Sequence, residues 1–450
     1  MKRLVLELFP SADENEEPKI VFRVTDPPLF GIPARPLTVT ATEAEFEALK
    51  QASLHGGAVR LAGQKLFEAL ALNREVGDQL TAALQARPDE HCPVYLQITA
   101  SAGVEDLPWE TLCSPGGDFL ALDERWGLGR AVESITATPP AYTFSPPLRI
   151  AAILSCLNVE AGEELAALRE AIATVPQLGT ELLLFTSEEK VYEAITAESP
   201  PGIQVEIVPT ELRELQEKVQ GFQPHVLHFF CHGTTVAEPH LLVATKKNWI
   251  TGRMEESLAI GAKEFRRFTR ETDPPPWLLV LNACESAANA AQENLQSLAS
   301  RLLYYGAAPA VVGMREPVLS GDANLLTSAF YRRLLSDLRN RLAGKDFAGN
   351  PVDWVVGLVV EVRHQLALKD PALTLDMAAA STKEWTLPVA YVSVRPFTLQ
   401  VMAAASARIR LEMEGLRQLH DALPPDPAAD PLRADAMARI GQMEKQLEES

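Results

Sequence analysis

Two short apolar runs, each ending in polar residues, are the clearest feature of the hydrophobic pattern. Residues 224–233 read PHVLHFFCHG and residues 278–286 read LLVLNACES. Nearly continuous Val, Leu and Phe over the length of a strand is typical of parallel strands covered by helices on both faces. Sites in open α/β sheets lie just beyond the carboxyl ends of such strands. We therefore expect His232 and Cys284 to lie on neighbouring loops at one edge of a sheet.

Alternating strand and helix patterns surround these two runs. The expected strands are residues 148–154, 181–185, 203–208, 241–244, 307–314 and 389–394. The expected helices are residues 163–173, 189–197, 212–219, 292–305, 324–338 and 352–368. Such alternation predicts right-handed βαβ units. The fold class is therefore α/β, with a mostly parallel sheet flanked by helices.

The first part of the chain has its own pattern, which predicts an N-terminal α/β lobe over residues 1–138. Strands are expected at residues 1–9, 20–24, 36–40 and 94–98, and helical periodicity covers residues 43–51 and 61–85. Four prolines between Pro139 and Pro147 then predict an extended connector, because proline fixes φ and removes a hydrogen-bond donor. The main α/β domain is expected over residues 139–400.

Residues 401–450 predict a C-terminal helical hairpin. Ile409, Met413 and Leu416 share one helical face, and prolines at 424, 425 and 427 break the chain. A short heptad seam of Ala436, Ile440, Met443 and Leu447 follows. This seam could pack on the protein's own surface or bind a regulatory protein partner, and the pattern leaves both interpretations open.

Composition restricts the classes of function. A length of 450 residues suits two or three domains, and a net charge of −19 repels nucleic acid and anionic membranes. Five cysteines without a C-x-x-C spacing argue against a disulfide framework and a zinc site. The first ten residues lack a sustained apolar core, so no signal peptide is expected and a cytoplasmic location is predicted. Phosphate-loop, dinucleotide, serine-hydrolase and zinc-peptidase motifs are absent from the sequence, so no cofactor is expected.

Several motifs together carry a family resemblance. FFCHG and LNACES resemble the two signature motifs of the CHAT group of caspase-like (clan CD) cysteine peptidases, which are related to separase and caspases. Residues 107–112 (LPWETL), 302–314 (LLYYGAAPAVVGM) and 385–394 (WTLPVAYVSV) are similar to further segments of that group, in the same order. The resemblance covers about residues 100 to 395 and implies a caspase-like sheet. A His about fifty residues before the nucleophilic Cys is also the caspase order.

The resemblance implies a catalytic dyad of Cys284 and His232. Cys284 would be the nucleophile, and His232 would protonate the leaving nitrogen and then activate water. The backbone N–H groups of Gly233 and Cys284 would form the oxyanion hole. Taken singly, Cys284 and His232 could each be an ordinary buried residue. By strand alternation, His228 is interpreted as a hydrogen-bonded core histidine and Cys231 as a core residue on the opposite face; His225 and His240 are interpreted as surface or loop residues.

A substrate pocket is the weakest element of this hypothesis. Several relatives prefer Arg or Lys before the scissile bond, held by an acidic group. Asp322 and Glu316 follow the strand after Cys284, where the family builds this pocket. Either acid could instead be solvated, and Asp322 could be a helix N-cap.

The resemblance implies a cysteine endopeptidase that cuts another protein at few sites. In this family such enzymes are often held inactive until a partner, ligand or processing event acts, and some serve bacterial defence and cell death. The main alternative is a catalytically idle interaction module with the same fold. A transferase on the same sheet is a further alternative that no cofactor motif supports.

Overall fold

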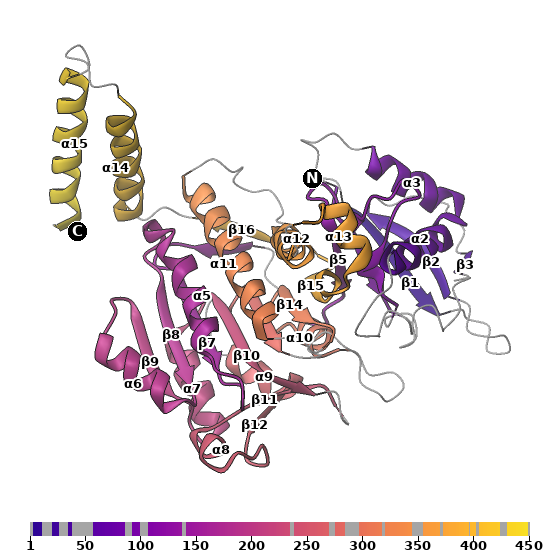
Figure 1. Cartoon of the computed structure of the whole chain (residues 1–450), viewed down its shortest axis with the longest axis horizontal. Helices are drawn as coiled ribbons and strands as arrows, with labels where there is room; N and C mark the ends of the chain where they lie inside the picture. The colour runs from indigo at the N-terminus through magenta and orange to yellow at the C-terminus, as the bar shows by residue number, and fades with distance from the viewer. Residues whose placement is uncertain are drawn as a thin grey trace.

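The computed structural model describes most of the chain. The described residues are 3–10, 20–26, 35–37, 57–85, 92–99, 107–136, 141–234, 238–269, 275–283, 297–316, 320–343, 354–369, 372–395, 397–401, 405–423 and 430–448. Within them, strands from both halves of the chain form one 14-stranded sheet, which runs through the body of the molecule (Figure 1). The predicted α/β class with a mostly parallel, helix-flanked sheet is confirmed.

The seven strands that form the main path of the sheet after residue 148 are parallel except at one pair. They are β7 (Arg149–Leu154), β8 (Glu181–Thr186), β9 (Ile203–Ile207), β10 (Val226–Thr234), β13 (Leu278–Ala283), β14 (Ala310–Met314) and β15 (Pro388–Ser393). The order across the sheet is β15-β14-β13-β10-β7-β8-β9. Only the β14–β15 pair in this series is antiparallel. The sequence of elements predicted from the hydrophobic runs is therefore confirmed for these strands.

The N-terminal strands extend the same sheet. They are β1 (Leu4–Pro10), β2 (Ile20–Asp26), β3 (Arg35–Leu37), β4 (Val94–Ile98) and β5 (Leu128–Val132). β5 pairs in parallel with β15, so hydrogen bonding continues from the N-terminal strands into the rest of the sheet. The hydrophobic pattern did not predict β5. The predicted domain boundary near residue 138 would divide strands that belong to one sheet. It remains a prediction.

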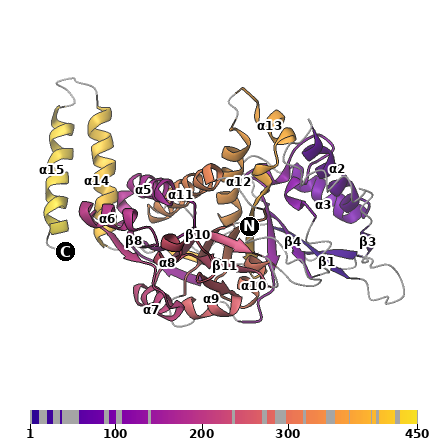
Figure 2. The same ribbon diagram turned by 60° about the horizontal axis from the view of Figure 1, so that its bottom comes forward.

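Helices cover both faces of the main sheet, as Figure 2 shows. One face carries α5 (Gly162–Ala173), α11 (Ser320–Leu342) and α12 (Trp354–Ala367). The other face carries α7 (Leu212–Phe222), α9 (Ala262–Thr269) and α10 (Leu298–Tyr304). α6 (Glu189–Glu198) packs near the β9 edge. Because both faces are covered, the central strands contain apolar residues at nearly every position, which explains the two runs seen in the sequence.

The predicted helix over residues 61–85 is two helices, α2 (Ala58–Ala71) and α3 (Arg74–Leu84). Asn73 separates them because its side-chain oxygen accepts the backbone N–H groups of Glu75 and Val76. An asparagine in this position is a strong N-cap, and it starts a new helix where the periodicity alone suggested one continuous helix. The helix predicted at residues 43–51 lies outside the described residues.

A long connection joins β10 to β13. It contains β11 (His240–Val243), α8 (Lys246–Thr251) and β12 (Leu258–Gly261). β11 pairs antiparallel with the end of β10 and with β12. The connection therefore returns directly beside the polar end of β10 before the chain enters β13.

The C-terminal segments form the predicted helical hairpin. β16 (Thr398–Val401) first pairs with β6 (Ala141–Phe144) in a separate two-stranded sheet, which also confirms the extended connector. α14 (Ala405–Ala422) and α15 (Asp430–Glu448) then pack against each other and stand beside the body of the protein (Figure 1). α13 (Leu375–Ser381) packs on α2. Among the helices of the described residues, none has the length and apolarity needed to span a bilayer.

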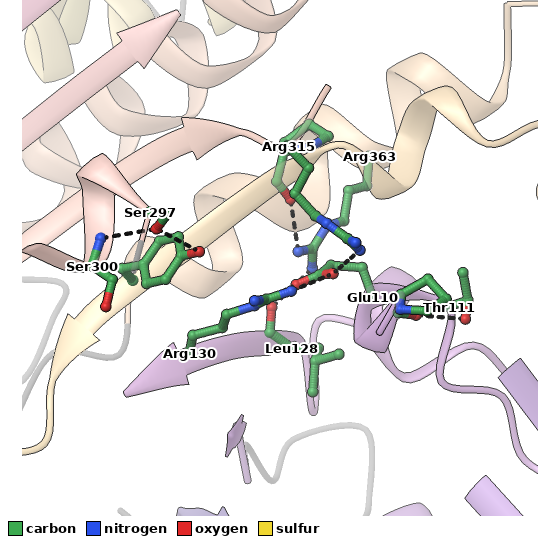
Figure 3. Close-up of polar contacts among 11 residues, drawn as sticks. Glu110, Thr111, Leu128, Arg130, Ser297, Ser300, Arg315 and Arg363 are labelled. Atoms are coloured by element: carbon green, nitrogen blue, oxygen red, sulfur yellow. Dashed lines mark hydrogen bonds and ion pairs between the residues drawn. The ribbon is translucent and has the colours of Figure 1, made fainter. Parts of the chain in front are cut away.

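A buried carboxylate ties the LPWETL segment to the sheet. Glu110 is completely buried and accepts two hydrogen bonds of 3.1 Å from Arg130 of β5 and one of 3.2 Å from Arg315 at the end of β14. Figure 3 shows both arginine side chains directed at Glu110. Burial alone would raise the pKa of Glu110, but Arg130 and Arg315 outweigh it and lower the pKa to about 2.

Arg363 of α12 completes this cluster. Its guanidinium donates to the backbone oxygens of Ala121, Leu128 and Pro388 at 2.9–3.2 Å. Arg363 and Leu128 are drawn in Figure 3. Burial lowers the pKa of Arg363 to about 10, while the charge of Glu110 acts in the opposite direction. The cluster therefore joins four segments of the chain, and Glu110 is the acceptor that Arg130 and Arg315 share.

We predict that Glu110→Gln lowers the free energy of unfolding by about 3–5 kcal/mol at pH 7, because it leaves Arg130 buried without a counter-charge. The Glu110 pKa is lower in the folded state than in the unfolded chain. Its stabilising contribution is therefore present above about pH 4.5 and is lost as the pH falls toward 2.

Chemical denaturation at several pH values checks this prediction. The difference in stability between wild type and Glu110→Gln should shrink by about 3 kcal/mol between pH 6 and pH 2. Glu124→Gln is the matched control, since Glu124 forms a half-exposed ion pair with Arg333 and its loss should cost less than about 1 kcal/mol. An equal loss in the two variants would contradict the assigned role of Glu110.

Candidate functional site

The polar ends of β10 and β13 lie side by side. The two strands are parallel neighbours, and Cys231 is paired with Ala283 at the last position of the register. His232 follows Cys231 in β10, and Cys284 is bonded to Ala283 in the chain. Cys284 itself lies outside the described residues. The dyad hypothesis requires that β10 and β13 be adjacent strands, and they are. The role of each side chain remains a prediction.

The ring of His232 forms a hydrogen bond with the loop that follows β7, the strand on the other side of β10. Its Nε2 lies 2.7 Å from the backbone oxygen of Leu157, in the loop that follows β7. A carbonyl oxygen only accepts hydrogen bonds, so Nε2 carries the proton in this contact. The neutral ring then has its lone pair on Nδ1, the atom that can take or hold a proton from a reacting group.

The loop that supplies this carbonyl is itself fixed to β10. The N–H of Ser155 donates to the backbone oxygen of Phe230 at 2.8 Å, and Cys156 forms a bridge with Val159. Asn158 turns the chain with a φ of 65°, a left-handed conformation that asparagine tolerates better than most residues. These contacts hold the Leu157 carbonyl close to His232.

β11 pairs with the end of β10 that carries His232, and Ala244, just after β11, is hydrogen-bonded to Ser155 in the loop that follows β7. His232 is paired with Leu242 and Gly233 with Leu241 in an antiparallel ladder. His232 and Gly233 are both partly buried. Gly233 thus lies in the part of β10 that is paired with β11, beyond the last paired positions of β7 and β13. Its proposed part in an oxyanion hole remains a prediction.

Strand alternation correctly separates the other residues of this motif. Cys231 is buried in the core cluster that contains Leu227 and Phe229, on the face opposite His232, as predicted. His228 is confirmed as a hydrogen-bonded core histidine. Its Nε2 lies 2.9 Å from Glu164 Oε1, and its Nδ1 lies 3.1 Å from the hydroxyl of Tyr331.

His225, interpreted from the sequence as a surface or loop residue, lies in the loop before β10, but it is not on the surface. Its side chain is 5% exposed, and its Nδ1 accepts the backbone N–H of Arg149 at 3.0 Å. Burial lowers the pKa of His225 to about 4. The residue precedes β10 and is covered by Phe144 from β6, a packing contact that the local pattern cannot indicate.

Both candidate pocket acids are paired with lysines of the chain. Glu316 lies 2.9 Å from Lys383, and Asp322 forms an ion pair with Lys369. Asp322 is 8% exposed and lies inside the first turn of α11, so it is neither a fully solvated residue nor the N-cap. The following residue, Ala323, accepts a hydrogen bond of 3.0 Å from Asn282 of β13. Asp322 is therefore close to the strand that leads to Cys284.

Two features of this region were missed by sequence reasoning, the Leu157 carbonyl and the buried Glu164. A backbone oxygen leaves no sequence signal. Glu164 does leave one, because it lies on the same helical face as Leu168 and Ala171, both fully buried. A carboxylate at helical spacing within an apolar face indicates a buried acid with partners. Among the described residues, no group of His, Cys, Asp and Glu is arranged to hold a metal ion.

Comparison with known proteins gives the class of the chain. The family model for the CHAT domain matches residues 60–344. The chain belongs to the CHAT domain family, which confirms the resemblance drawn from FFCHG and LNACES. A solved structure of the Saccharomyces cerevisiae separase–securin complex is also similar, with 14% sequence identity and a TM-score of 0.34. That match covers 75% of this chain and 18% of the other. No curated protein sequence matches the chain.

We predict that neutral His232 is protonated on Nε2 and bare on Nδ1, because the Leu157 carbonyl can only accept. Long-range ¹H–¹⁵N spectra of the ring nitrogens at pH 8.5 check this tautomer. His232→Gln removes the resonance pair and so identifies it. A proton on Nδ1 in wild type would contradict the assignment.

Proposed function

We propose that this chain is a cysteine endopeptidase that cleaves a specific protein substrate with Cys284 and His232. The observation that supports this best is the parallel pairing of β10 with β13, which ends at Cys231 and Ala283. The next residue of each strand is one member of the dyad. Neighbouring strands lie about 4.8 Å apart, so the two side chains start within reach of one substrate peptide bond.

In the proposed mechanism, the Cys284 thiolate attacks the substrate carbonyl carbon and forms a C–S bond. Backbone N–H groups of Gly233 and Cys284 stabilise the negative oxygen of the tetrahedral intermediate. His232 gives a proton to the leaving nitrogen as the C–N bond breaks. His232 then takes a proton from water as the water oxygen attacks the acyl carbon, and the C–S bond breaks to release the acid and return Cys284 as a thiolate beside protonated His232. The Leu157 contact supports this role, since it orients the ring with Nδ1 as the atom that exchanges the proton.

The wider setting belongs to the same proposal. The chain would act in the cytoplasm on a protein substrate, with residues 1–138 as an N-terminal lobe, residues 139–400 as the catalytic domain and residues 401–450 as a helical tail. A regulatory protein would bind the α14–α15 hairpin, which packs mainly on itself and leaves Leu419, Leu432 and Met437 exposed. A place in a bacterial defence or cell-death system is part of this proposal and rests on the family resemblance alone.

We predict that Cys284→Ala and His232→Ala each abolish substrate cleavage while the fold is retained. Cys231→Ala should cleave normally, because Cys231 faces the opposite core. Cleavage is measured by proteolysis profiling, with products of neighbouring genes as candidate substrates. The loss should exceed about 10³-fold, since a covalent mechanism has no substitute nucleophile.

Labelling with a peptidyl electrophile distinguishes the enzyme from the idle interaction module. The label should appear on wild type and on Cys231→Ala and be absent from Cys284→Ala. Persistence of the label on Cys284→Ala, or full turnover by that variant, would refute the nucleophile. A folded wild type that neither cleaves nor reacts with the label would favour the interaction module.

We predict that fluorogenic peptides ending in Arg are cleaved at least about tenfold faster than peptides ending in Asp, equal to about 1.4 kcal/mol. An incoming Arg would replace Lys369 or Lys383 at Asp322 or Glu316, whereas Asp would be repelled. Asp322→Asn and Glu316→Gln should reduce this preference. A faster rate with Asp would reject the acidic pocket.

A further inference from the structure

Glu164 is a buried carboxylate on which contacts from both strands of the proposed dyad converge. It lies in the first turn of α5 and is completely buried. One of its oxygens, Oε1, lies 2.9 Å from His228 Nε2, 2.9 Å from Asn282 Nδ2 and 2.5 Å from Thr327 Oγ1. These partners come from β10, β13 and α11, so a single atom joins four elements of the fold.

The partners of Glu164 are close in sequence to the proposed dyad. His228 precedes His232 by four residues on the same face of β10. Asn282 precedes Cys284 by two residues in β13. Glu164 itself follows the loop whose Leu157 carbonyl holds His232. Each of the three backbone segments that lead to the site therefore has a side chain in the Glu164 cluster.

The protons of the cluster can be assigned from its chemistry. The amide nitrogen of Asn282 only donates, and it also reaches the backbone oxygen of Ala323. Burial raises the pKa of Tyr331 well above its ordinary value, so its hydroxyl keeps its proton. If that hydroxyl donates to His228 Nδ1, His228 Nε2–H faces Glu164. Oε1 of Glu164 then accepts hydrogen bonds from all three neighbours.

Such a cluster restricts movement more than apolar packing does. Displacement of any one element leaves a buried polar group without its partner, and this is costly where water cannot replace it. Apolar contacts between the same elements could slide by a fraction of an ångström at lower cost. The cluster therefore acts as a fixed point close to the polar ends of β10 and β13.

We propose that Glu164 is a positioning residue of the catalytic site, which holds the His232 and Cys284 segments and the Leu157 loop in register. This inference rests on the proposed function, because it assigns Glu164 a task in that chemistry. Glu164 would contact neither the substrate nor the reacting atoms. Its effect would arise because misplacement of reacting groups by about 1 Å can cost about 10²-fold in rate.

Glu164→Gln is the main test because it keeps the shape of the side chain and removes its charge. The neighbouring Glu163→Gln is the matched control, since Glu163 is exposed and bonds Asn324 at the surface. We expect kcat of Glu164→Gln to fall at least about tenfold while KM changes less than about threefold. Both constants of Glu163→Gln should stay within about twofold of wild type, and thermal unfolding should confirm that both variants are folded.

Alkylation of Cys284 by iodoacetamide, followed by mass spectrometry as a function of pH, gives a second readout that needs no substrate. The thiolate is the reactive form, and a well-placed His232 favours it. The alkylation profile of Glu164→Gln should move to higher pH, and that of Glu163→Gln should coincide with wild type. An active wild type together with an unchanged kcat and profile in Glu164→Gln would overturn the positioning role.

The two proposals can fail separately. If wild type cleaves no substrate and Cys284 is unreactive, the proposed peptidase fails. If wild type is active, the inference about Glu164 is decided by the variants. Should Glu164→Gln fail to fold, His228→Gln and His228→Leu replace it. Gln keeps an N–H donor toward Glu164 and should retain kcat within about threefold, whereas Leu should lose about tenfold; equal rates would overturn the inference.

Discussion

The parallel pairing of β10 with β13 is the constraint on which the rest of the site depends. These strands belong to a sheet covered by helices on both faces, and their hydrogen-bonded register fixes which residues leave the sheet together. A shift of one residue would turn every side chain to the opposite face. Because His228 and Asn282 each reach the same Glu164 oxygen, this register is fixed by specific polar contacts in addition to apolar packing.

Two buried carboxylates hold the molecule together in different ways. Glu110 is surrounded by arginines, so its charge is compensated and its pKa is lowered. Glu164 is surrounded by an imidazole, an amide and a hydroxyl, which offer hydrogen bonds without requiring a formal positive charge. Glu110 connects the LPWETL segment to β5 and β14, whereas Glu164 connects the helices of one face to β10 and β13. Together they couple the N-terminal strands to the edge where the proposed dyad lies.

The same edge also carries acids that have partners within the chain. Asp322 forms an ion pair with Lys369, and Glu316 forms one with Lys383. Both lysines come from segments that follow α12. A basic substrate group would therefore exchange one ion pair for another, with a smaller net gain than binding to an unpaired acid. The structure thus links the candidate pocket to the C-terminal part of the sheet as well as to α11.

Local sequence indicated most of the strands, most of the helices, the opposite orientation of Cys231 and His228, and the hairpin of α14 and α15. These features follow from the period of apolar residues, which reflects burial on one face or both. The break at Asn73 could have been predicted from its capping chemistry, although the periodicity concealed it.

Only the tertiary structure decided the pairing of β5 with β15, the burial of His225 and the partners of Glu110 and Glu164. Glu164 meets Asn282 at a sequence separation of 118 residues, and Glu110 meets Arg315 at a separation of 205. The sequence of either segment contains no information about the other's position until the sheet forms. The chain therefore specified which residues could carry the chemistry, and the contacts between distant segments determined how those residues are held.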